Sequence, residues 1–401
     1  MKSTIWSPHL NKEYVLKHKE IPVVTFRMNE ENYELLGINE ILDVKRLPFS
    51  IENNNNLAQC AIKLNSLIRG RGLADSRKDI NKIKYLFKAE NKEELIIRSY
   101  GLNLTDHYWL HKTEENLKWS ELNFFDNKFD KLKVGGKANP DIDESVGDKS
   151  PNFCVDGSIE KRWIIKENDV RVLLKGSRYN RMQEPFNEVI ASKITDELGI
   201  EHVAYNLKRT EEKNIPYSEC KCMADRNFEY INASFVMEGG EYERKEPYIH
   251  YLEMCEKNGL HNVKEKIDEM IALDFIIGND DRHRGNFGII RNADNLEWAR
   301  TAPVFDNGNC LFFDRDNDDM EYFGVDSLGK AFGDSNRLCL NYIDSPDWYS
   351  PAVGEKIIDI VRDGLSNNER LKSERIDKVT NIVKERIAIF EKIVGKKNKT
   401  N

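Results

Sequence analysis

The stretch DFIIGNDDRHRGNF, residues 274–287, decides how the rest of the chain is interpreted. It begins apolar and ends in carboxylates, amides, one His and two Arg. Asp281 is followed five positions later by Asn286, a spacing found where an Asp accepts a hydroxyl proton and an Asn holds a metal ion. The same residues also suit a polar turn that leaves a buried helix, with Asp and Asn capping backbone groups. On this stretch alone, catalysis and a structural turn both remain open.

The composition of the 401-residue chain limits its class. Domains of ~100–200 residues predict two or three units, and 39% apolar residues are enough for hydrophobic cores although 32% are charged. The formal net charge of −8 argues against direct nucleic-acid binding, which usually needs a basic field. Because no long apolar run and no paired Cys motif occur, we expect a cytoplasmic protein with reduced thiols and no membrane segment.

The pattern along the chain predicts an α+β fold in four regions. Residues 1–133 are interpreted as an N-terminal α/β accessory module, and residues 134–151, rich in Gly, Asp, Pro and Ser, as a linker. Residues 152–238 predict a first lobe of strands with one helix. Residues 239–401 predict a second, mainly helical lobe that contains the stretch quoted above.

Short strands and long helices are expected in the two lobes. The predicted strands lie within residues 152–169, 169–177, 202–210, 217–224 and 228–237, and a further strand ends at Asp306. A helix is predicted over residues 184–199, opened by Glu184-Pro185 and closed by Gly199. A buried helix over residues 263–278 leads into the polar stretch, and amphipathic helices over residues 351–364 and 369–395 close the chain.

Transfer of a phosphoryl group needs cations on the phosphates, a base for the accepting hydroxyl and tight positioning. In VDGSIEK, residues 155–161, Gly157 lets the backbone approach phosphate oxygens, and successive N–H groups can form an anion nest. Lys175 ends an apolar strand, where an ammonium can lie over nucleotide phosphates, and Glu188 in the next helix is placed to pair with it. Taken singly, these features also fit a turn, a surface Lys and a solvated helical Glu.

The later candidates supply a base and a metal site. Asp281 is the candidate base, Asn286 a candidate metal ligand, and His283 a residue that contacts phosphate or orients Asp281. Asp306 in APVFDNG, residues 302–308, is placed to hold magnesium, which prefers carboxylate and phosphate oxygens. The alternative for Asp306 is a simple Asp-Asn-Gly turn. The ordered set of Lys, Glu, Asp-x4-Asn and Asp is stronger evidence for phosphoryl transfer than any one of these residues alone.

This ordered set resembles the HipA-family serine/threonine kinases, the toxin-type kinases of bacterial toxin–antitoxin modules, over residues 152–340. The family loop Asp-x-His-x-x-Asn-Phe is met by Asp281, His283, Asn286 and Phe287, the strand Lys by Lys175, and the helix pair by Asn187 and Glu188. Val304, Phe305 and Asp306 stand where the family has Phe-Tyr-Asp. Gly157 and Lys161 match the phosphate loop Ser-x-x-Gly-x-x-x-Lys, with Cys154 in place of the Ser.

The resemblance implies a bilobal kinase-like fold, ATP and magnesium as cofactors, and transfer of the γ-phosphoryl group to a Ser or Thr of a protein. The residues that it implies for ATP binding are Asp156, Gly157, Ser158, Lys161, Lys175, Glu188, His283, Asn286, Phe305 and Asp306. The resemblance is also compatible with a DNA-binding antitoxin protein as a partner. Because Cys154 replaces the family Ser, self-phosphorylation of the loop is expected either at Ser158 or not at all, and Ser158 also suits a plain turn.

Two further classes of function remain open at this stage. One is a kinase-shaped binding module without activity, which would be expected to lack at least one of Lys175, Asp281, Asn286 and Asp306; all four are present. The other is a kinase that acts on a small molecule or a lipid. Incubation with labelled ATP and magnesium separates these classes from a protein kinase.

Overall fold

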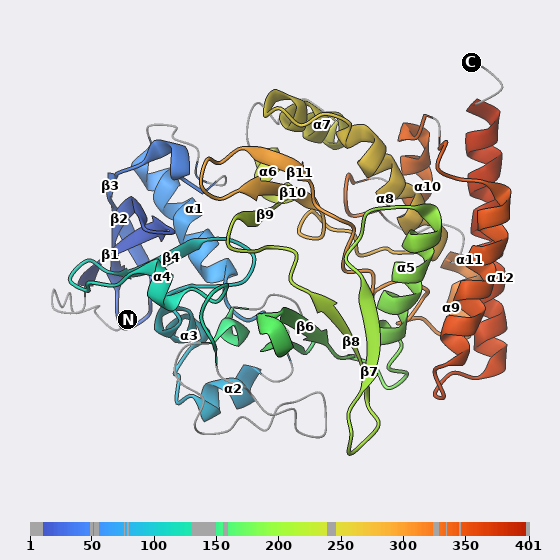
Figure 1. Ribbon diagram of the computed structural model, residues 1–401, viewed down its shortest axis with the longest axis horizontal. Helices are drawn as coiled ribbons and strands as arrows, with labels where there is room; N and C mark the ends of the chain where they lie inside the picture. The colour runs from blue at the N-terminus through green and yellow to red at the C-terminus, as the bar shows by residue number, and fades with distance from the viewer. Residues whose placement is uncertain are drawn as a thin grey trace, which may run out of the picture.

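A computed structural model describes most of the chain (Figure 1). The described residues are 11–48, 51, 56–75, 77, 80–129, 150–154, 159–238, 246–323, 329–333, 335–344 and 346–397. They form helices and three antiparallel sheets, so the predicted α+β class is confirmed. Residues 130–149, which include most of the predicted linker, lie outside the described part, and the predicted domain limits stay predictions.

The N-terminal module, residues 11–129, is built on a four-stranded sheet of order β3-β2-β1-β4. Its elements are β1 (Asn11–His18), β2 (Ile21–Asn29), β3 (Leu35–Ile41), α1 (Leu57–Gly70), α2 (Ile80–Leu86), α3 (Lys92–Arg98), β4 (Tyr108–Lys112) and α4 (Trp119–Leu122). The apolar side of α1 buries Cys60, Leu64 and Ile68, which join the core of the sheet. This i, i+4 spacing keeps the three side chains on one helix face.

The second sheet has the order β5-β6-β8-β7 and carries one long helix. Its elements are β5 (Lys161–Ile165), β6 (Arg171–Lys175), α5 (Glu184–Leu198), β7 (Tyr205–Arg209) and β8 (Pro216–Lys221), after a 3-10 turn at Pro151–Phe153. The predicted helix is confirmed: α5 has Pro185 in its first turn and ends at Gly199, whose φ of +67° suits glycine. In the β5–β6 register, Lys161 lies opposite Lys175.

The remaining part of the chain combines a three-stranded sheet of order β11-β10-β9 with helices. The elements are β9 (Phe228–Asn232), α6 (Ala233–Glu238), α7 (Pro247–Lys257), α8 (Val263–Ile277), β10 (Gly288–Asn292), β11 (Trp298–Thr301), α9 (Asn317–Phe323), α10 (Asn336–Cys339), α11 (Pro351–Ser366) and α12 (Ser373–Lys397). A Cβ at Gly288 would lie 2.1 Å from the Ile231 carbonyl oxygen, so only glycine allows β9 and β10 to pair there.

Helix α8 lies in the largest hydrophobic core, together with side chains of α5, α11 and α12. It is apolar on most sides, as expected for a buried helix. It ends at Gly278 in the left-handed conformation (φ +64°), and the polar stretch leaves the core there. The α11 and α12 helices stand at the opposite end of the molecule from the N-terminal sheet (Figure 1). Among the described helices, none is long and apolar enough to cross a membrane.

The strand predicted over residues 228–237 is wrong in its extent. It ends at Asn232, and the chain continues as α6. The Asn232 side-chain oxygen accepts the Phe235 N–H at 3.1 Å, which is how an Asn starts a helix. Phe235 and Val236, which are β-prone, therefore become helical.

The strand predicted to end at Asp306 is also wrong. It reduces to one isolated bridge between His202 and Val304. Pro303 has no N–H for a strand ladder, and Asp306 has a φ of +57°, in the left-handed region that strands do not use. The segment thus turns sharply at the residue predicted to hold a metal.

Candidate functional site

Lys175, Glu188 and Asp306 meet at the buried end of β6. The Lys175 Nζ lies 2.7 Å from Glu188 Oε1 and 2.9 Å from Asp306 Oδ1. Strand β6 supplies the Lys and α5 supplies the Glu, while Asp306 arrives from a segment more than a hundred residues later. The structure therefore brings together the three charges that the sequence predicted as a set.

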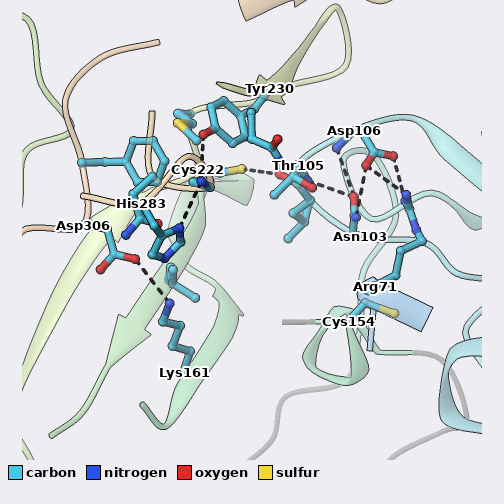
Figure 2. A pocket seen from close by; sticks show the side chains of 18 of the residues that line it. Arg71, Asn103, Thr105, Asp106, Cys154, Lys161, Cys222, Tyr230, His283 and Asp306 are labelled. Atoms are coloured by element: carbon cyan, nitrogen blue, oxygen red, sulfur yellow. Dashed lines mark hydrogen bonds and ion pairs between the residues drawn. The ribbon is translucent and has the colours of Figure 1, made fainter. Parts of the chain in front are cut away.

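Opposite charges favour the ionised forms of Lys175 and Asp306, whereas burial raises the pKa of Glu188. Burial alone would lower the pKa of Lys175, but Asp306 and Glu188 outweigh burial and raise that pKa well above its usual value. Burial would raise the pKa of Asp306, yet Lys161 and Lys175 hold it below its usual value. The Lys161 Nζ lies 3.5 Å from Asp306 Oδ2 (Figure 2), so Lys161 and Lys175 both face the Asp306 carboxylate.

The polar stretch after α8 is braced from within by Arg282, which is 2% exposed. Its Nε lies 3.0 Å from Asp274 Oδ2, so the loop is tied back to the helix that precedes it. Its NH1 donates to the carbonyl oxygens of Asn286 at 2.9 Å and Phe305 at 2.5 Å. One guanidinium thus fixes the Asp281–Asn286 loop against the segment that carries Asp306.

Both carboxylate oxygens of Asp281 have a donor. Lys330 Nζ lies 2.6 Å from Oδ1, and Asn309 Nδ2 lies 2.5 Å from Oδ2. The Asn286 Nδ2 donates to the Asp281 carbonyl at 3.3 Å. The exposed His283 accepts the Gly285 N–H at its Nδ1 (3.0 Å); its described ring contact is therefore with the loop backbone and not with the Asp281 carboxylate.

Most of the candidate side chains line one cavity of about 700 Å³. Its lining includes Lys161, Lys175, Asp281, His283, Asn286 and Asp306, and Phe305 also faces it. This volume is in the range of small-molecule and cofactor sites. Two ammonium groups suit phosphates, and the oxygens of Asp306 and Asn286 are of the kind that magnesium prefers. The residues present therefore fit a magnesium–nucleotide complex.

The predicted phosphate loop lies only partly in the described residues. Asp156, Gly157 and Ser158 lie outside them, and their assigned contacts stay predictions. Cys154, at the start of the loop, is buried, and its Sγ lies 3.4 Å from Ser99 Oγ of the N-terminal module. Burial raises the pKa of the Cys154 thiol. The described start of the loop is thus attached to the N-terminal module.

The N-terminal module also lines the cavity, which the sequence did not predict. Lys63 of α1, Arg71 directly after α1, and Asp106 in the loop before β4 line it; Figure 2 shows Arg71 and Asp106. That loop reaches the segment after β8: Cys222 Sγ donates to the Leu104 carbonyl at 3.2 Å. The partners are 118 positions apart, and no local pattern signals such a contact. Tyr205 near Lys175, and Asn309 and Lys330 on Asp281, were missed as well.

A second buried cluster joins the N-terminal module to β9. His18, His107 and Glu229 place ligand-type atoms within 4.8 Å of one another. The guanidinium of Arg291 already lies 2.6 Å from Glu229 Oε1. Arg46 donates to His18 Nδ1 at 3.1 Å, so the ring proton sits on Nε2 and points at Glu229. Both His18 nitrogens are therefore used in hydrogen bonds, and the described contacts form a buried network around the Glu229–Arg291 ion pair.

Comparison with known proteins gives a short match and two similar structures. No family model matches the chain. Forty-four residues, 11% of this chain and 13% of the relative, are 43% identical to the serine/threonine-protein kinase CtkA of Helicobacter pylori. The chain thus matches only a small part of that curated relative's length.

The two structures are similar at low sequence identity. One is the Helicobacter pylori proinflammatory kinase CtkA, with a TM-score of 0.49, 18% identity, and coverage of 60% of this chain and 94% of that one. The other is the toxin–antitoxin complex of HipA, HipB and operator DNA from Shewanella oneidensis MR-1, with a TM-score of 0.49, 12% identity, and coverage of 95% and 97%. With the motifs set out above and a curated kinase matched over 44 residues, this chain is similar to kinases of the HipA type.

Proposed function

We propose that this chain is an ATP- and magnesium-dependent serine/threonine protein kinase of the HipA type. The observation that carries the proposal is the contact of Lys175 with both Glu188 and Asp306, at a cavity that Lys175 and Asp306 line. Protein kinases need a Lys–Glu ion pair over the nucleotide phosphates and an Asp for the metal. The three residues come from separate segments, and a structural ion pair does not require a cavity beside it.

Each side chain has a task that its position supports. Lys161 and Lys175 bind the phosphates, and Asp306 with Asn286 would hold magnesium, which supplies charge neutralisation between phosphate oxygens. Asp281 takes the proton of the accepting hydroxyl as the hydroxyl oxygen bonds to phosphorus and the bond to the leaving oxygen breaks. Arg282 keeps the base and the metal ligand at a fixed separation by holding the loop at both ends.

The acceptor in this proposal is a Ser or Thr of another protein. The short curated match is to a protein named a serine/threonine-protein kinase. Following the resemblance of the motifs, the proposal extends to a toxin role, a DNA-binding antitoxin protein as partner and a place in the cytoplasm.

The test is incubation of the purified full chain with γ-labelled ATP and magnesium, alone and with dephosphorylated casein. We expect label on Ser or Thr, shown by phosphoamino-acid analysis, and loss of it in Asp281→Asn. Nucleotide binding without transfer would instead identify a kinase-shaped binding module. Label that appears only on a small molecule or lipid of an added cell extract would identify the third class.

A further inference from the structure

Lys330 contacts a candidate site residue, and no sequence motif predicts that contact. We propose that Lys330 is a positioning residue that holds the Asp281 carboxylate in the orientation required of a general base. The proposal rests on the proposed kinase function, because it assigns a task within that reaction. It starts from the 2.6 Å contact between Lys330 Nζ and Asp281 Oδ1.

Asp281 is held by one donor on each oxygen. Asn309 Nδ2 lies 2.5 Å from Oδ2, the oxygen that Lys330 does not contact. A carboxylate that is hydrogen-bonded at both oxygens has a fixed plane. A carboxylate that is hydrogen-bonded at one oxygen can rotate about its terminal bond. Removal of Lys330 would therefore leave the base in place but free to turn, with fewer productive orientations.

The backbone that carries Lys330 is anchored to the polar stretch it serves. Arg284 Nε donates to the Ala331 carbonyl at 3.3 Å. Phe332 is 3% exposed, and its ring lies 5.5 Å from that of Phe287 and 5.3 Å from that of Tyr248. Lys330 is thus presented by a segment whose next two residues are fixed to the loop and to the core. An ordinary surface Lys has no such support.

The contact is expected to matter for rate and little for stability. The Lys330 side chain is 52% exposed and that of Asp281 28% exposed, and exposed ion pairs add little to folding. Orientation of a base acts on the transition state, so its loss lowers kcat and leaves ATP binding unchanged. A fall in kcat with unchanged ATP binding therefore distinguishes a positioning role of Lys330 from a general structural role.

The experiment compares wild-type chain with Lys330→Met and Lys330→Arg in the casein assay. We expect kcat to fall about 10- to 100-fold in Lys330→Met, the scale of a misplaced catalytic group, with the KM for ATP within about twofold of wild type. Lys330→Arg keeps the charge and one donor, and we expect it to restore most of kcat. Lys356→Met is the matched control, because Lys356 makes a similar exposed contact of 2.8 Å with Glu197 on a different part of the surface.

Each outcome decides the assignment. Equal kcat in wild type and Lys330→Met overturns the role of Lys330 and leaves the kinase function standing. The same loss in Lys330→Arg as in Lys330→Met, or a parallel loss of melting temperature, shows a structural role and also overturns it. A wild-type chain that transfers no label to casein or to itself overturns the proposed function, and the role of Lys330 falls with it.

Discussion

The ammonium nitrogen of Lys175 lies 2.9 Å from Asp306 Oδ1 and 2.7 Å from Glu188 Oε1, so one buried cation faces two carboxylates. Lys161 adds a second cation at 3.5 Å from the other oxygen of Asp306. The Asp306 carboxylate is therefore ionised, and protein cations balance its charge. Any magnesium that binds there must share Asp306 with these ammonium groups, which the phosphates of a nucleotide would draw toward themselves.

This arrangement predicts the behaviour of Asp306→Ala. We expect the variant to bind ATP more weakly in the presence of magnesium and to lose most of the magnesium dependence seen in wild type. ATP titrations by calorimetry, with magnesium and with a chelator, measure that dependence. Asp359→Ala, which removes an exposed carboxylate from α11, is the control and should keep it. If the ATP affinity of Asp306→Ala depended on magnesium as strongly as that of wild type, Asp306 would be only a turn residue.

Asp281→Asn tests the proposed base. The amide cannot accept the hydroxyl proton, and loss of a general base costs about 10²–10⁴ in rate. ATP affinity should stay near that of wild type, because Lys161 and Lys175 are untouched and lie on the Asp306 side of the cavity. Single-turnover transfer of label gives the rate, and ATP titration gives the affinity. Wild-type turnover by the folded variant would remove Asp281 from the mechanism.

The parts of the site that the sequence predicted are those that short motifs encode. Lys175 at a strand end, Glu188 thirteen positions later in a helix, and the spacing of Asp281 and Asn286 are local patterns. The helix start at Glu184-Pro185 and its end at Gly199 follow from backbone rules that act over a few residues. In the structure Lys175, Asp281 and Asn286 line one cavity, and Glu188 contacts Lys175.

The parts that the sequence could not predict depend on contacts between distant residues. Lys330 meets Asp281 across 49 positions, and His18 meets Glu229 across 211. Neither Lys330 nor His18 belongs to a sequence motif. An exposed Lys and a His in a strand are too common to indicate a particular contact. The change from strand to helix at Asn232 was missed for another reason: Phe235 and Val236 are β-prone, and the Asn232 side-chain hydrogen bond starts a helix there.

Phosphorylation of the loop is the next prediction. Cys154, in the position of the family Ser, is buried against Ser99 and has no hydroxyl to accept phosphate. If chain incubated with ATP and magnesium phosphorylates its own loop, we expect the phosphate on Ser158, where a charge of about −1.5 to −2 would repel the phosphates of ATP; the alternative is a loop that carries no phosphate. Mass spectrometry of wild type and Asp281→Asn would locate it. An unmodified loop in a preparation that phosphorylates other sites rules out Ser158 as the acceptor.

The Glu229 network predicts how acid affects the junction of the N-terminal module with β9. Burial would raise the pKa of Glu229, but Arg291, His107 and His18 hold it well below its usual value. Below about pH 4 an unfolded Glu gains a proton that the folded one does not, so the contribution of Glu229 to stability is full at neutral pH and falls as the pH drops toward the lowered pKa. Removal of this charge takes away the carboxylate that faces the buried Arg291, which keeps its contact with Tyr108 Oη at 3.2 Å.

Glu229→Gln should therefore lower the free energy of unfolding by about 3–5 kcal/mol at pH 7, as expected when one member of a buried ion pair is lost. The difference from wild type should shrink at pH values below about 4, because the wild-type carboxylate then loses its advantage. Chemical denaturation of both proteins across this pH range measures the difference. Glu201→Gln is the control: Glu201 pairs with Arg300 at 2.8 Å on the surface, and its loss should cost less than about 1 kcal/mol. Equal, small effects of the two substitutions would mean that the buried network does not stabilise the junction.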